Sequence, residues 1–437
     1  MVIKIAKKDV ESIKEYNPFE HRVVVKPNSD VRSLANLVKA SLGSGLLAMP
    51  LAFANAGWGV GIIGTAIIAF ICGHCVHIFV VTSRRCCQLE QKPLLSYSET
   101  CQAAFWNGPK FLRPYANFAK IFADFSLFFT YVGVCCIFTV LIATSIKQLL
   151  DTYASSTILS IEYYCLILLL PLCLMVQIKH LKWLAPFSLM ANVLLFATFA
   201  ICLYYIFGDD ITTTGRTAVG HWSRFPAFLS TVIFAMEGIG VVMPVENTMK
   251  KPQHFLGCPS VMVIAMVTVM ILYSILGLFG YFRYGSDVKG TITLNLPMDD
   301  WPAICAKVFI SISIFFTYPL HFFVVIDTFT RYSEPYINKK YQNVTQIGVR
   351  SFIVCFCGGV GMALPYLEQI IDLVGALFYS ILGLIIPGMI ETIVRWNDLG
   401  KFNWVLYKNI LIVMFGMLSL ISGSAVTIID IVERATT

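Results

Sequence analysis

Eleven long stretches of the chain are almost entirely apolar, and short polar segments separate them. About 20 apolar residues in a helix suffice to cross the roughly 30 Å hydrocarbon core of a membrane. A helix also satisfies its own backbone hydrogen bonds, which an open strand cannot do in lipid. The pattern therefore predicts an all-α polytopic membrane protein with eleven transmembrane helices, over 33–56, 59–83, 115–147, 162–178, 183–207, 225–249, 259–283, 302–330, 346–365, 367–393 and 404–430.

The composition removes several other classes of protein. Of 437 residues, 57% are hydrophobic and 13% are charged, and the charged share is about half that of a soluble protein. So little polar surface excludes a soluble enzyme, a nucleic-acid-binding protein and a secreted module. No hydrolase or phosphate-binding motif is present, and Cys72, His74, Cys75 and His77 lie in an apolar run without further ligands. We therefore expect no enzymatic activity, no cofactor and no metal site.

The positions of Lys and Arg predict the orientation of the helices. With the N-terminus in the cytoplasm, the segments on that side hold 23 of the 32 Lys and Arg residues, as the positive-inside rule requires. The polar N-terminal segment lacks the apolar stretch of a signal peptide. We expect a cytoplasmic tail over 1–32, a transmembrane domain over 33–430 and a short non-cytoplasmic tail over 431–437.

Two of the runs carry a Gly-x-Gly motif near their middle. Residues 39–50 read KASLGSGLLAMP, and residues 234–244 read FAMEGIGVVMP. Each motif taken alone favours close helix packing, which small residues permit. Their matching positions in the first and sixth runs instead indicate two broken helices in a transporter built from inverted repeats. The repeats would cover about 33–207 and about 225–393, with an eleventh helix at about 404–430.

The two breaks would present opposite backbone ends to one cavity. A half-helix that begins near Ser44 exposes N–H groups and the positive end of the helix dipole, which suits a carboxylate. A half-helix that ends near Met236 exposes carbonyl groups and the negative end, which suits an ammonium group. Together these ends describe a site for a zwitterionic α-amino acid. The expected substrate-binding residues, including two aromatic candidates for the wall, are Ser41, Gly43, Ser44, Gly45, Leu46, Tyr131, Phe234, Ala235, Met236, Glu237, Gly238 and Tyr318.

The same residues carry a resemblance to a known family. Residues 36–50 read NLVKASLGSGLLAMP and residues 237–247 read EGIGVVMPVEN. They resemble the first and sixth helices of the amino acid/auxin permease family, and in particular its proton-assisted amino acid transporter branch. Segments 134–136 and 316–320 are similar to the third and eighth helices, less closely. The resemblance spans nearly the whole chain. It implies eleven helices, the five-plus-five inverted-repeat fold of the amino acid–polyamine–organocation type, and amino-acid transport, usually coupled to protons.

One position departs from that branch. Its members often carry a His three residues before the Lys of the first helix, where it is tied to proton coupling, but this chain has Asn36, which cannot titrate. Either another group carries the proton, or the protein is weakly coupled or facilitative. Charges inside a membrane are costly and are functional candidates. Glu237 and Lys39 are therefore the expected proton-coupling residues, with a structural pairing as the alternative. Sodium is the other coupling ion considered, because Ser311 and Thr317 on the eighth helix could ligate it in this fold. Ser and Thr more commonly bond their own helix backbone.

These features predict a secondary active transporter of small, neutral α-amino acids that works by alternating access. The expected partners are the amino-acid substrate, a coupling proton and membrane lipid, and no nucleic acid. The alternative is an amino-acid sensor that signals with little flux to a cytoplasmic partner through residues 1–32. An ion channel would need an acidic ring or a filter, which the sequence lacks. The expected location is the plasma membrane or an endolysosomal membrane.

Overall fold

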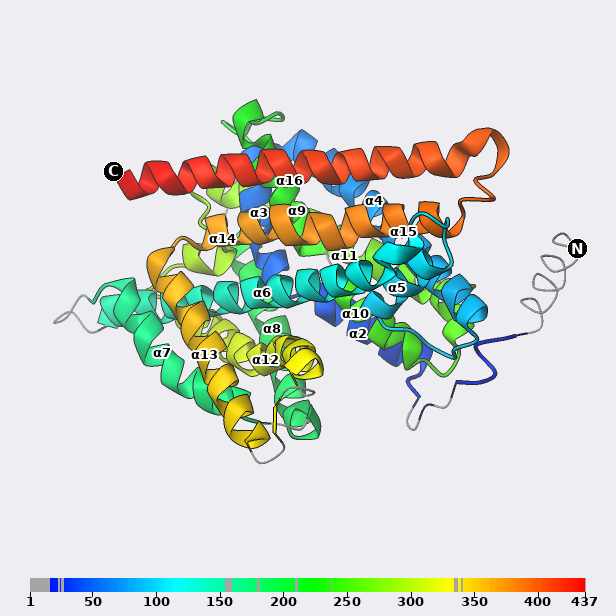
Figure 1. Ribbon diagram of the computed structural model, residues 1–437. Helices are drawn as coiled ribbons and strands as arrows, with labels where there is room; N and C mark the ends of the chain where they lie inside the picture. Colours follow the sequence, from blue (N-terminus) through cyan, green and yellow to red (C-terminus); the bar gives the residue numbers. More distant parts are fainter. Residues whose placement is uncertain are drawn as a thin grey trace, which may run out of the picture.

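The computed structural model describes residues 16–22, 24, 27–153, 159–178, 181–208, 211–236, 238–333, 337–338 and 341–436. This part of the chain forms helices and no β-strand, with one isolated β-bridge between Asn28 and Met249. The longer helices lie side by side in a bundle (Figure 1).

The longer elements, in chain order, are α2 (Asp30–Ser41), α3 (Ser44–Ala56), α4 (Trp58–Glu90), α5 (Tyr97–Trp106), α6 (Ala116–Tyr153), α7 (Ile161–Val176), α8 (Leu181–Phe207), α9 (Phe225–Met236), α10 (Ile239–Asn247), α11 (Val261–Tyr284), α12 (Trp301–Ser333), α13 (Gln342–Ala363), α14 (Leu367–Val374), the π-helix η7 (Gly375–Ile385), α15 (Ile386–Val394) and α16 (Trp404–Thr436). Short 3₁₀ helices connect them: η1 (Arg113–Tyr115), η2 (Trp222–Arg224), η3 (Pro252–Phe255), η4 (Gly285–Asp287), η5 (Ile292–Asn295) and η8 (Lys401–Asn403).

Nine helical spans in the described chain are long and apolar enough to cross a membrane. α2 and α3, whose axes differ by 50°, together make a tenth. Each predicted run coincides with a helix or with helices placed end to end. The fourth run coincides with α7, which has 16 residues and is shorter than the other spans. The prediction of an all-helical, multi-pass membrane protein is thus confirmed.

The tenth run is not a continuous α-helix. α14 leads into η7, an eleven-residue π-helix, and η7 leads into α15. This run packs tightly on α9, because a Cβ added to Gly375 would lie 2.2 Å from the carbonyl oxygen of Ser230. Thr231 of α9 also donates a hydrogen bond of 2.5 Å to the carboxylate of Asp372 on α14. η7 is therefore fixed beside α9.

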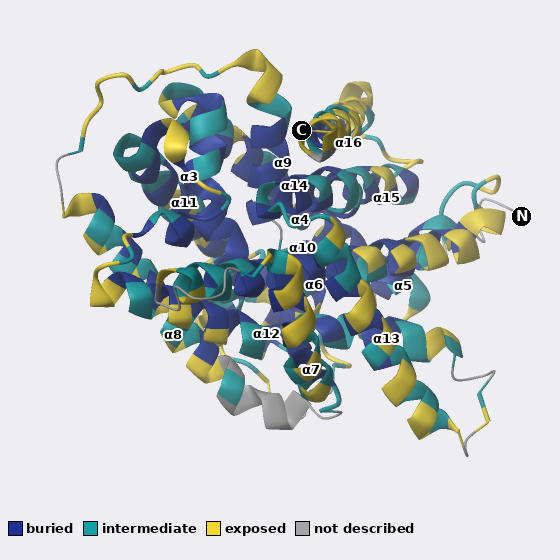
Figure 2. Cartoon of the chain, turned by 90° about the vertical axis from the view of Figure 1, so that its left-hand side faces the viewer, coloured by how far each residue is buried: buried dark blue, intermediate teal, exposed yellow. Residues whose placement is uncertain are grey.

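The centre of the bundle is buried, and its outer surface is apolar. The side chains of Phe53, Phe228 and Tyr318 are inaccessible to solvent. α16 lies along the edge of the bundle and shows many exposed residues (Figure 2), among them the apolar Met414 and Ile421. An exposed apolar face of this length marks a surface that contacts lipid or another protein, so the outer helices fit immersion in a membrane.

The first described residues are fastened to the end of the bundle where α4 and α10 end. Nη1 of Arg22 donates to Oε2 of Glu246 at 2.9 Å, and Nε of Arg84 donates to Oε1 of Glu246 at 3.1 Å. Both guanidinium groups lie 5.1 Å from the centre of the Phe19 ring. The side chain of Glu246 is inaccessible to solvent, and that of Arg22 is 4% exposed. We call Phe19, Arg22, Arg84 and Glu246 the N-terminal clamp.

Backbone contacts extend this attachment up to the start of α2. The N–H of Asn28 donates to the carbonyl of Thr248, and the N–H of Lys250 donates to the carbonyl of Asn28, both at 2.8 Å. Nδ1 of His254 lies 2.6 Å from a carboxylate oxygen of Asp30. The described part of the predicted N-terminal tail therefore packs against the bundle.

Candidate functional site

The first helix is broken between Ser41 and Ser44. α2 ends at Ser41, α3 begins at Ser44, and their axes differ by 50°. Gly43 is the N-cap of α3 and has no side chain to accept a hydrogen bond from its first turn. The first N–H groups of a helix have no acceptors within the helix. α3 therefore begins inside the protein with an uncapped, positive end.

The sixth predicted run contains two helices in succession, which together count as one span and lack the sharp bend between α2 and α3. α9 ends at Met236, and α10 begins at Ile239 with Gly238 as its N-cap. Glu237, which completes this junction in the sequence, lies outside the described residues. The two junctions are close together, because a Cβ added to Gly45 would lie 2.7 Å from Cα of Ala235.

The hydroxyl group of Tyr273 on α11 connects the two junctions. It donates to the carbonyl of Ser41 at the end of α2 and to the carbonyl of Ala235 near the end of α9, the latter at 2.8 Å. A phenol carries one hydrogen, so the two carbonyls share it. Tyr273 is fully buried. The sequence analysis missed this residue, because its run is apolar on every side and gives no sign of which face points inward.

A cavity of about 490 Å³ adjoins both junctions. This volume lies in the range of small-molecule binding sites. Seven predicted substrate-binding residues line it, together with Lys39, Thr317 and Asn36. The seven are Ser41, Gly43, Ser44, Gly45, Tyr131, Phe234 and Ala235.

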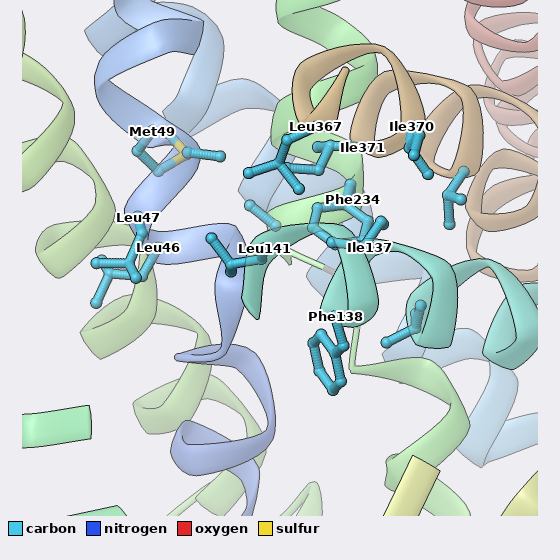
Figure 3. Close-up of a cluster of buried hydrophobic side chains, with 14 of the residues drawn as sticks. Leu46, Leu47, Met49, Ile137, Phe138, Leu141, Phe234, Leu367, Ile370 and Ile371 are labelled. Atoms are coloured by element: carbon cyan, nitrogen blue, oxygen red, sulfur yellow. The ribbon is translucent and has the colours of Figure 1, made fainter. Parts of the chain in front are cut away.

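Four other predicted residues do not line this cavity: Leu46, Met236, Gly238 and Tyr318. Leu46 belongs instead to a cluster of apolar side chains from α3, α6, α9 and α14, among them Leu141 and Ile371 (Figure 3). Met236 is buried in the same core, as is Tyr318, whose ring stacks on Phe322. Successive residues of a helix point in different directions, so one motif supplies both cavity wall and core.

Three hydroxyl groups in the middle of α12 donate to backbone carbonyls. Thr317 donates to Ser313 at 2.8 Å, and Ser311, which is not on the cavity wall, donates to Lys307 at 2.8 Å. Ser313 donates across to Ala191 of α8 at 2.6 Å. These hydroxyls therefore have the structural use that is common for Ser and Thr in helices.

His321 of α12 also lines the cavity and was missed by the sequence analysis. Its Nδ1 lies 3.3 Å from the carbonyl oxygen of Thr317. Its ring centre is 5.7 Å from that of Tyr131 and 5.1 Å from that of Phe138. Lys39 lines the same cavity. The sequence did contain a sign of this position. Residues four apart share a helix face, and His321 lies four residues after the candidate Thr317.

A second hollow, of about 320 Å³, lies between α4 and α11. His74, His77, Met262 and Met266 are among the residues that line it. It shares no lining residue with the central cavity. Within the described ranges, no three His, Cys, Asp or Glu residues are grouped so as to hold a metal ion.

This architecture defines a polytopic helical membrane protein with an internal small-molecule cavity beside interrupted helices. The chain belongs to the transmembrane amino acid transporter protein family, whose family model matches residues 26–429. The resemblance seen in the sequence is thereby confirmed. Members of this family are transporters and not enzymes.

Individual relatives agree with this assignment. The chain is 40% identical over 420 residues to the proton-coupled amino acid transporter-like protein pathetic of Drosophila melanogaster, covering 96% of this chain and 88% of that protein. It is 23% identical over 414 residues to amino acid transporter AVT3C of Arabidopsis thaliana, covering 91% and 90%. A solved structure of a Na⁺-coupled sialic acid symporter, substrate-bound and outward-open, aligns with a TM-score of 0.46 and 14% identity over 96% of this chain and 94% of that one.

Proposed function

We propose that this protein carries an α-amino acid across a membrane by alternating access, in symport with a proton. The observation that carries the proposal is that the uncapped start of α3 and the end of α9 both line one cavity. N–H groups of residues 43–46 would bind the carboxylate, and carbonyl groups near 234–236 would bind the ammonium group. The carbonyl of Ala235 already accepts from Tyr273, but a carbonyl oxygen has two lone pairs.

The remaining wall favours a small, neutral substrate. Much of it is apolar, and no Asp or Glu is found on the part of the wall that the structure describes. A cationic substrate side chain would find no acidic partner among these described residues, and burying an unpaired charge is unfavourable. An apolar side chain would contact residues such as Val134, Phe138, Leu195, Ile310 and Ile314.

A proton is the proposed coupling ion. Of the two candidate sodium ligands, Ser311 does not line the cavity, and the hydroxyl hydrogen of Thr317 is bonded to the backbone. Lys39 lines the cavity one turn before the first junction, and Glu237 adjoins the second in the sequence. A gradient of one pH unit supplies about 1.4 kcal/mol, and 100 mV supplies about 2.3 kcal/mol per charge. Together they support a concentration ratio of several hundred.

The proposed topology has eleven spans, with α7 counted as one of them. The elements from α2 to α8 and from α9 to α15 would form two inverted repeats, each opening with an interrupted helix, and α16 would follow. The N-terminus would be cytoplasmic, in the plasma membrane or an endolysosomal membrane. The excess of Lys and Arg in the segments on that side supports this orientation.

A panel of radiolabelled amino acids in proteoliposomes tests the proposal. We expect saturable uptake of small neutral amino acids that is faster with acid outside, about pH 5.5, than at about pH 7.5, and that does not depend on Na⁺. Uptake driven by Na⁺ and insensitive to pH would contradict proton coupling. Amino-acid binding without flux under any condition would contradict transport and favour a sensor.

A further inference from the structure

The imidazole of His321 is held in one orientation. Nδ1 lies 3.3 Å from the carbonyl oxygen of Thr317, one turn earlier on α12. Because a carbonyl oxygen only accepts, Nδ1 carries the hydrogen in the neutral ring. Tyr131 and Phe138 of α6 lie beside the ring, with centres 5.7 Å and 5.1 Å away. The backbone thus fixes the tautomer and leaves the lone pair on Nε2.

Nε2 is the atom at which this ring can bind a proton. It has no hydrogen-bond partner within the described part of the chain. Because the ring lines the cavity, a proton that reaches the cavity through water can reach Nε2. Protonation forms one N–H bond at Nε2, leaves the Nδ1–H bond to Thr317 intact, and converts the ring to an imidazolium.

The groups around the ring determine when it is charged. Lys39 of α2, when cationic, opposes a second positive charge. Tyr131 of α6 and Tyr379 of η7 line the same cavity as neutral phenols. The described wall contributes no Asp or Glu to offset the charge. The carboxylate of a bound amino acid would favour the imidazolium.

We propose that His321 is the residue that binds and releases the coupling proton. A hydronium ion on one side of the membrane would transfer a proton to Nε2, which breaks one O–H bond and forms one N–H bond, and the reverse transfer would return the proton to water on the other side. Substrate and proton raise each other's affinity, because the coupling between two bound ligands is reciprocal. This inference rests on the proposed function and gives to His321 the proton-carrier role that the sequence suggested for Glu237 and Lys39.

The test measures amino-acid uptake and internal acidification in the same proteoliposomes, which contain an entrapped pH dye. We expect wild-type uptake to acidify the interior. His321→Gln should still exchange labelled for unlabelled amino acid at a reduced rate but should not acidify the interior, and its uptake ratio between about pH 5.5 and 7.5 should fall to about one. His74→Gln and His77→Gln, in the hollow between α4 and α11, should behave as wild type. Acidification by His321→Gln equal to wild type would overturn the inference.

A second measurement decides the case in which His321→Gln does not transport. Calorimetry of amino-acid binding in buffers with different ionisation enthalpies counts the protons taken up on binding. Binding by His321→Gln or His321→Asn without proton uptake would support the inference, and proton uptake equal to wild type would overturn it. Loss of binding in both folded variants would assign His321 to substrate contact instead and would also overturn it. Absence of amino-acid uptake by wild type would refute the proposed function itself.

Discussion

Gly43 and Gly45 occupy the same motif for different physical reasons. A Cβ on Gly43 would meet no atom within 4 Å, whereas one on Gly45 would lie 2.7 Å from Cα of Ala235. We expect Gly45→Ala to destabilise the protein by about 1–3 kcal/mol, because overpacked sites force the backbone to shift. Gly43→Ala should unfold at the wild-type temperature but take up less amino acid, because its methyl group occupies the cavity. Thermal unfolding and uptake of both variants check this, and equal destabilisation would contradict it.

Tyr273→Phe tests the connection between the two interrupted helices. The change removes the one hydrogen that the carbonyls of Ser41 and Ala235 share. Leaving a buried acceptor unpaired costs about 1–3 kcal/mol, so we expect a lower unfolding temperature and slower uptake. Tyr281→Phe on the same helix is the control, because Tyr281 pairs with Thr217 at the longer distance of 3.5 Å. If both variants lose the same stability, Tyr273 has no special role.

Residues that act through the backbone were easier to predict from the sequence than residues that act through side chains. Gly43 and Gly45 were recognisable because Gly-x-Gly interrupts an apolar run. Tyr273 lies in a run that is apolar on all sides and has no polar face to show which side points inward. His321 does share a helix face with the candidate Thr317, but that spacing does not show what the face contacts. Their roles depend on contacts between α11, α12 and helices distant in the sequence, which a single run does not encode.

At the scale of elements, the N-terminal clamp fastens the segment before α2 to the end of α10. Arg22→Ala would leave the buried Glu246 paired with Arg84 alone. Losing one charged hydrogen bond costs about 1.5–3 kcal/mol, and each 1.4 kcal/mol is a factor of about ten in population. We therefore expect amide hydrogen exchange in residues 16–30 to accelerate about tenfold or more.

Arg32→Ala is the control for the clamp, because Arg32 is exposed on α2. Its exchange should match wild type when both proteins are measured by mass spectrometry. Unchanged exchange in Arg22→Ala would show that the backbone contacts of Asn28 hold this segment without the ion pairs.

Element positions were predictable, and their internal geometry was not. The membrane forces each long apolar run into a helix, so the runs and the helices coincide. The π-helical geometry of η7 arises where Gly375 packs against the backbone of α9. That contact joins residues far apart in the sequence, and hydrophobicity alone does not reveal it.

At the scale of the whole molecule, the first described residues and the C-terminus lie at opposite ends of the bundle (Figure 1). Because 23 of the 32 Lys and Arg residues belong to segments on the N-terminal side, we expect that side to be cytoplasmic. In cells that display the protein at their surface, an antibody should reach a C-terminal epitope tag without permeabilisation and an N-terminal tag only after it. Access to both tags on intact cells would contradict an odd number of spans.

The buried charges at the end of α10 have a consequence for motion. Removing Glu246 by mutation would leave the guanidinium groups of Arg22 and Arg84 without their acidic partner, and an unpaired buried charge costs about 3–5 kcal/mol. Separating the ion pairs by exposing them to water costs less free energy, because hydration of the separated charges offsets most of the lost attraction. The N-terminal clamp is therefore more sensitive to the loss of Glu246 than to opening into water.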